Sequence, residues 1–177
     1  KLGIDICRAL ETCEKKNNVI HRDIKPENIF VSKTGNYKLG DFGIAKVLGD
    51  RDKTASKKGT EPYMAPEVYR GEAYDRTTDL YCLGLVLYRY MNENRLPFLP
   101  LTGGIRTSER DAAINRRMSG EVIPPPVHAL EGFASVICKA ISFRPEDRYA
   151  SAVDMRLALE AVLDETISTM PEDRKRA

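Results

Sequence analysis

Apolar and polar residues recur along the chain with a spacing that predicts a mainly helical protein. A first amphipathic helix is expected to end near Asn17-Asn18, and its apolar positions are Leu2, Ile6, Ala9, Leu10 and Cys13. Residues 80–87 are apolar on every helical face, which indicates a buried central helix. An exposed helix is expected at residues 108–118 and an amphipathic one at 130–141.

Two helix starts carry capping signals. Thr77 or Thr78 is expected to cap the central helix, with Asp79 in its first turn, where a carboxylate suits the helix dipole. Ser151 stands three residues before Asp154, as in a capping box, and this pair is expected to open the last helix. The apolar residues expected on one face of that helix are Val153, Leu157 and Ala161.

Strand signals are few and short. Residues 29–31 and 37–39 are strand-like runs, and the Gly35-Asn36 pair in the link between them predicts a hairpin. Residues 41–67 are polar, basic and punctuated by glycine, so they indicate one long loop of the kind that usually carries function. The expected fold class is therefore mainly α with one small β-hairpin.

Composition narrows the possible functions. The chain has 177 residues, of which 42% are hydrophobic and 31% charged, and a net charge of +2. This balance favours a globular domain and gives no electrostatic reason to expect nucleic acid or a membrane as its main partner. Residues 80–88 form the most apolar stretch and are too short to span a bilayer. We expect a cytoplasmic protein, although a longer parent could carry an anchor elsewhere.

The cysteines indicate a reducing environment. They are scattered without a C-x-x-C pair, at Cys7, Cys13, Cys82 and Cys138. Disulfide or metal frameworks need closer grouping, so we expect reduced thiols that mostly pack among apolar neighbours.

The polar stretch at residues 21–28 holds the groups that phosphoryl transfer requires. It contains a carboxylate, a cation and an amide oxygen, at Asp23, Lys25 and Asn28. Asp41 offers a second oxygen ligand, which the predicted hairpin would fold back beside the first. Mg²⁺ prefers a few protein oxygens together with phosphate and water, so one Asp and one Asn suffice.

Three ordered motifs then carry a family resemblance. The chain reads H-R-D-I-x-x-x-N at residues 21–28, D-F-G at 41–43 and A-P-E at 65–67, with Ile24 where the signature has Leu. From residue 2 to residue 163 it resembles the eukaryotic-type protein kinases, and residues 95–100 resemble bacterial members. The resemblance implies the α+β kinase fold, with residues 1–164 as the C-terminal lobe and 165–177 as a charged tail.

The resemblance also implies roles for the polar residues. Asp23 corresponds to the catalytic base, and Lys25 to the lysine with which Ser/Thr kinases contact the γ-phosphate. Asn28 and Asp41 correspond to the two Mg²⁺ ligands. ATP and Mg²⁺ are thus the implied cofactors, and a protein with an accessible Ser or Thr is the implied substrate.

Other positions match the family's nucleotide, substrate and regulatory sites. Phe30 corresponds to the floor beneath adenine, and the backbone of Glu27 to a position near the ribose. Thr60 matches the substrate platform of Ser/Thr kinases, although it could simply satisfy a turn. Thr54 and Ser56 are candidate autophosphorylation sites.

Two further contacts are implied as structural. The family pairs the glutamate at Glu67 with a buried arginine, for which Arg148 is the match. Its central helix begins with an aspartate, here Asp79, whose carboxylate binds the backbone of the His21-Arg22 region.

The kinase family also has a smaller N-terminal lobe with a Gly-rich loop, and no G-x-G-x-x-G occurs in these residues. The chain opens at Lys1 inside a helical pattern, so we expect a fragment that lacks this lobe and is inactive alone. Its exposed lobe interface near Phe30, Leu39 and Phe42 is expected to allow self-association. A pseudokinase scaffold and a kinase of small molecules remain as alternatives.

Overall fold

The computed structural model describes residues 1–17, 19–41, 46–47 and 61–169. Its helices are α1 (Leu2–Asn17), α2 (Pro66–Tyr69), α3 (Thr77–Tyr90), α4 (Thr107–Met118), α5 (Glu131–Ala140) and α6 (Ala152–Thr169). Short 3-10 turns are η1 (Pro26–Asn28), η2 (Glu61–Tyr63) and η3 (Pro145–Asp147). The strands are β1 (Val19–Ile20), β2 (Ile29–Val31), β3 (Tyr37–Leu39) and β4 (Lys46–Val47). The mainly helical prediction is confirmed.

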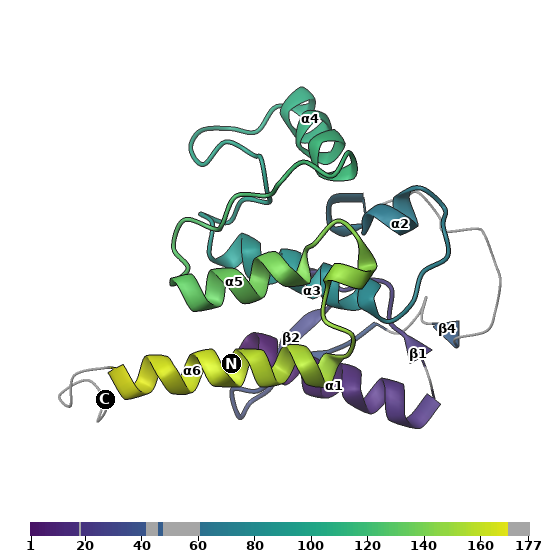
Figure 1. Ribbon diagram of the computed structural model, residues 1–177, viewed down its shortest axis with the longest axis vertical. Helices are drawn as coiled ribbons and strands as arrows, with labels where there is room; N and C mark the ends of the chain where they lie inside the picture. Colours follow the sequence, from purple (N-terminus) through teal and green to yellow (C-terminus); the bar gives the residue numbers. More distant parts are fainter. Residues whose placement is uncertain (18, 42–45, 48–60, 170–177) are drawn as a thin grey trace.

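The central helix α3 organises the core. Residues 77–88 are all buried, as the apolar pattern predicts. Helix α5 packs on α3, and α6 packs on both α1 and α5, while α4 lies at the opposite end of the molecule (Figure 1). A Cβ at Gly84 would lie 2.7 Å from Ile141 Cγ2 and 2.9 Å from Ala140 Cβ. Glycine at this position therefore lets α5 approach α3 closely.

The strands form two separate pairs. β2 and β3 are antiparallel with Ile29 opposite Leu39, which confirms the predicted hairpin. β1 pairs with β4, with Val19 opposite Val47. The predicted loop at 41–67 therefore contains β4 and η2 and the start of α2. Two-residue strands that pair across a long sequence separation have no periodic signal, so the sequence did not predict them.

The start of α3 differs from the prediction. Arg76 occupies the N-cap position, and Asp75 Oδ1 accepts hydrogen bonds from the Thr77 amide at 2.8 Å and the Thr77 hydroxyl at 2.6 Å. Thr78 is turned to Glu67 instead, donating from its hydroxyl to Oε1 at 2.8 Å. The expectation that Thr77 or Thr78 caps α3 is wrong, because the carboxylate just before the helix takes that role.

Helix α6 begins as predicted but buries another face. Ser151 Oγ accepts the Asp154 amide at 3.1 Å, which confirms the N-terminal cap. The buried residues are Ala152, Met155 and Leu159, whereas Leu157 is 53% exposed. Apolar residues occur almost all round this helix, so two faces have the same spacing and the contacts with α1 and α5 decide between them. The division predicted between residues 164 and 165 falls inside α6 and stays a prediction.

The exposure of helix α4 and the state of the cysteines largely agree with the expectations. Helix α4 is mostly exposed as expected, but Ala113 and Arg117 are buried. All four cysteines are free, with Cys7 and Cys82 buried and the other two half-buried. In the described part of the chain, no helix is long and apolar enough to cross a membrane.

Candidate active site

Asp79 anchors the polar loop to the core. From the first turn of α3, its two carboxylate oxygens accept the backbone N–H of His21 at 2.7 Å and of Arg22 at 2.8 Å, as predicted. Arg22 has a φ of 72°, in the left-handed region that costs a non-glycine residue about 1 kcal/mol or more. Burial raises the pKa of Asp79 to about 6, although the two backbone hydrogen bonds act to lower it. The anchor is thus ionised at neutral pH.

Asp23 lies at the centre of a compact cluster of polar side chains. Its Oδ2 receives Lys25 Nζ at 2.7 Å and Asn28 Nδ2 at 2.9 Å. Asn28 Nδ2 also donates to the Asp23 main-chain carbonyl at 2.8 Å. The structure therefore brings together the carboxylate, the cation and the amide that the sequence singled out.

The second oxygen of the Asp23 carboxylate, Oδ1, has different surroundings from Oδ2. Asp23 Oδ1 is buried and has no hydrogen-bond partner among the described residues. The two acceptors facing Asn28 fix which end of its amide is nitrogen, so its Oδ1 is the end that remains for a cation. An unsatisfied buried carboxylate oxygen is costly in a folded protein, and such atoms often mark a place for a ligand.

His21 ties the loop to the hairpin. Its Nε2 donates to the Gly40 carbonyl at 2.9 Å, so Nδ1 is the acceptor that faces the Asp23 amide at 3.4 Å. Burial lowers the pKa of His21, in agreement with this neutral form. The Gly40 amide in turn donates to the Asn28 carbonyl at 2.9 Å. The hairpin thereby returns the chain to the loop one residue before Asp41, which is exposed with a φ of 56°.

The remaining candidates have different surroundings. Phe30 is 55% exposed, and a Cβ at Gly40 would lie only 2.6 Å from its ring, so the ring lies across the glycine. Glu27 is exposed in η1. Of the other predicted positions, those that lie outside the described residues are Phe42, Thr54, Ser56 and Thr60.

Glu67 and Arg148 form the predicted buried pair. The glutamate oxygens receive Arg148 Nη1 and Nη2, each at 2.8 Å, and the side chains are 2% and 0% exposed. Arg148 also donates to the Phe143 and Ser142 carbonyls, and its guanidinium lies 4.6 Å from the centroid of the Tyr81 ring. These contacts satisfy both charges, as a buried ion pair requires.

The side-chain oxygens of Asn28 and Asp41 are candidate ligands for a divalent cation. Within the described ranges, no three His, Cys, Asp or Glu side chains are grouped as a complete metal site. Asn28 and Asp41 instead offer one amide and one carboxylate oxygen from adjoining segments. This incomplete oxygen set suits Mg²⁺ that brings phosphate and water as its other ligands.

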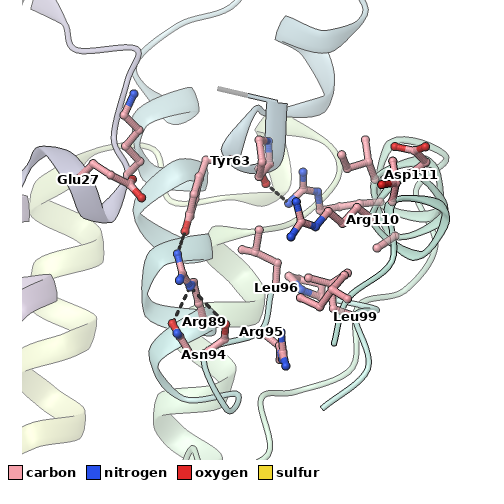
Figure 2. Close-up of a pocket in the computed structure, with 17 residues that line it drawn as sticks. Glu27, Tyr63, Arg89, Asn94, Arg95, Leu96, Leu99, Arg110 and Asp111 are labelled. Carbon is pink, nitrogen blue, oxygen red and sulfur yellow. Dashed lines mark hydrogen bonds between the residues drawn. The ribbon is translucent and has the colours of Figure 1, made fainter. Parts of the chain in front are cut away.

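A cavity of about 780 Å³ adjoins the cluster and was not anticipated from the sequence. Lys25 and Glu27 contribute to its wall, together with residues of α4. Figure 2 shows the Tyr63 hydroxyl pointing toward Arg89, whose Nη1 donates to it at 2.7 Å. No short motif marks this cavity, because its walls come from segments far apart in the chain.

Comparison with known proteins identifies the family of the chain. Residues 1–160 match the protein kinase domain family, and the chain belongs to it. It is 38% identical over 157 residues to the tyrosine-protein kinase MasK of Myxococcus xanthus, covering 85% of this chain and 23% of that protein. It is 36% identical over 166 residues to the serine/threonine-protein kinase PknB of Mycobacterium tuberculosis, covering 89% of this chain and 25% of PknB. The chain thus spans about a quarter of the length of these curated relatives.

Proposed function

We propose that residues 1–164 are the larger lobe of a protein kinase that transfers the γ-phosphate of ATP to Ser or Thr side chains of proteins. The observation that carries this proposal is the Asp23 carboxylate, which is buried, held by two donors on Oδ2, and without a partner on Oδ1 among the described residues. Serine/threonine specificity is supported by Lys25 and by the name of PknB, whereas the name of MasK points to tyrosine.

In this proposal each residue of the cluster has a distinct task. Asp23 Oδ1 accepts the hydrogen bond of the substrate hydroxyl and orients its oxygen toward the phosphate. Lys25 places its charge beside the same carboxylate, where it can neutralise the transferring phosphate. Asn28 and Asp41 would hold the Mg²⁺ of the nucleotide, and the bound cation supplies further neutralisation of phosphate charge.

The exposed ring of Phe30 supports a nucleotide site at the hairpin. We place adenine against this ring and the ribose near the backbone of Glu27. The rest of the nucleotide pocket would come from a smaller lobe outside these 177 residues, so the isolated chain would bind ATP weakly and turn over negligibly. The same face, with Leu39, would allow the isolated chain to self-associate. The free cysteines favour the cytoplasm.

The test is phosphate transfer from labelled ATP to a Ser/Thr protein by the longer kinase that contains this segment. Asp23→Asn should lower the rate by about 10²–10⁴-fold, because it removes the base and keeps the shape. The matched control is Asp147→Asn, an exposed aspartate in η3. A measurable rate that is equal in Asp23→Asn and the parent would refute the role of Asp23, and a parent that transfers no phosphate would favour a pseudokinase scaffold.

A further inference from the structure

The cavity beside the cluster is placed to receive the residues that flank a phosphorylated side chain. Lys25 lines this cavity, and its Nζ lies 2.7 Å from Asp23 Oδ2. A protein segment in the cavity would therefore place its neighbouring residue within reach of Asp23. A volume of about 780 Å³ accommodates several side chains.

The charge of this cavity is strongly one-sided. Glu27 and Asp111 are its acidic lining residues, whereas the cationic lining residues are Lys25, Arg89, Arg95, Arg110 and Arg117. The whole chain has a net charge of only +2. The excess of arginine is thus a local feature, and it comes from three segments of the chain, which are α3, the segment that follows it, and α4.

The arginines of the cavity differ from most others in their partners. Arg89, Arg95 and Arg110 have no ion pair with a carboxylate among the residues that the structure describes. Arginines that do pair with carboxylates in this chain are Arg8, Arg70, Arg76, Arg116, Arg148 and Arg156. Unpaired guanidinium groups gathered in one cavity leave an unbalanced positive potential, which attracts anionic groups.

Neutral oxygens hold two of these arginines in place. Arg89 Nε donates to Asn94 Oδ1 at 2.6 Å, and its Nη1 donates to the Tyr63 hydroxyl (Figure 2). Arg95 Nη2 donates to the Gly103 carbonyl at 2.7 Å. Such contacts orient the guanidinium groups without neutralising them. An incoming carboxylate would therefore meet preorganised donors.

We infer that this cavity selects protein substrates with Glu or Asp close to the phosphorylated Ser or Thr. The inference rests on the proposed function for its link to phosphorylation, while the charge preference of the cavity stands separately. Glu27 and Asp111 would instead favour basic residues, but they are outnumbered by Arg89, Arg95 and Arg110, which have no carboxylate partner among the described residues.

Binding of labelled peptides to the 177-residue chain tests the preference. Three peptides share one Ser-containing sequence and differ only in flanking residues, which are Glu, Gln or Lys. Fluorescence anisotropy at low salt should show the Glu peptide binding about tenfold tighter than the Gln peptide, with the gap narrowing as salt rises. Equal binding of the Glu and Gln peptides, or tighter binding of the Lys peptide, would overturn the inference.

Variants of the cavity arginines test whether this cavity produces the preference for the Glu peptide. Arg95→Gln combined with Arg110→Gln should reduce the gap between Glu and Gln peptides at least about threefold, because two unpaired charges are removed. Arg144→Gln, an exposed arginine that does not line the cavity, should leave the gap unchanged. Thermal melts of each variant check that the fold is kept. A gap that survives the double variant in a folded protein would contradict the assignment to this cavity.

The binding comparison involves no phosphate transfer, so it separates the two proposals. A charge preference without Asp23-dependent transfer by the longer kinase would support the anion-selective cavity and reject the proposed enzyme. Transfer that depends on Asp23, with no charge preference in binding, would reject only the cavity inference.

Discussion

Two buried carboxylates, Glu67 and Asp23, differ in how completely their oxygens are satisfied. Both Glu67 oxygens receive donors from Arg148, and Thr78 adds a hydroxyl to one of them. Asp23 has two donors on Oδ2 and none from the described residues on Oδ1. A carboxylate with every acceptor position filled holds the fold together, whereas one with a buried open oxygen is available to a ligand.

The first prediction removes a partner from the satisfied pair and should have the largest effect on stability. Arg148→Ala leaves Glu67 as a buried charge without its cation, and the expected loss is about 3–5 kcal/mol of unfolding free energy. Urea denaturation measures it. Arg70→Ala, whose partner Glu72 is exposed, is the control and should stay close to the parent. If Arg148→Ala loses no more unfolding free energy than Arg70→Ala, the Glu67–Arg148 pair does not hold the fold together.

The second prediction concerns the anchor of the loop. Asp79→Ala leaves the backbone N–H groups of His21 and Arg22 without an acceptor, and each buried orphan costs about 1–3 kcal/mol. We expect a loss of about 2–4 kcal/mol in the same denaturation experiment. Asp147→Ala serves as the control because that aspartate is exposed. Indistinguishable midpoints for the two variants would show that Asp79 does not hold the loop.

The third prediction is a dependence of stability on pH. Because burial lowers the pKa of His21, its neutral form stabilises the fold, and this contribution is lost as pH falls from about 6.5 through the lowered value. Asp79 acts in the opposite sense, since its pKa is raised to about 6 and stability linked to it grows as pH falls through that value. The pH dependence of the parent protein adds these two opposing contributions, so it does not reveal either one alone.

His21→Gln isolates the histidine contribution, because the amide can still donate to the Gly40 carbonyl but does not titrate. On going from pH 7.5 to pH 5.5, the urea midpoint of the variant should fall less, or rise more, than that of the parent, because only the parent loses the contribution of the neutral histidine. The same pH dependence in both proteins would show that His21 is not buried in neutral form.

The smallest predicted effect on stability lies at the hairpin. Gly40→Ala places a Cβ 2.6 Å from the Phe30 ring, which is 55% exposed and can move aside, so the cost should be about 1 kcal/mol or less. If Phe30 supports adenine, the displaced ring should nevertheless weaken nucleotide binding by the longer kinase, measured by calorimetry. Lys33→Ala, at an exposed position in the link of the same hairpin, is the control. Unchanged nucleotide affinity for Gly40→Ala would contradict a role for this ring.

The sequence predicted those features that short motifs or strong periodicity encode. The roles of Asp79 and Glu67, the hairpin and the buried helix α3 all have signals within a few residues. The buried face of α6, the Asp75 cap and the β1–β4 pair depend instead on which surfaces meet in the folded chain. The cavity has the same origin, since its arginines become neighbours only when α3, α4 and the segment between them come together.

The central claim is that Asp23 serves chemistry and Glu67 serves the fold, and it is tested most directly by measuring both properties in Asp23→Asn. This variant should unfold at a urea midpoint equal to or above that of the parent, because it neutralises a buried carboxylate that has one oxygen without a partner among the described residues. Phosphate transfer by the longer kinase should fall by about 10²–10⁴-fold in the same variant. A variant that loses stability while transfer continues at the parent rate would contradict the account.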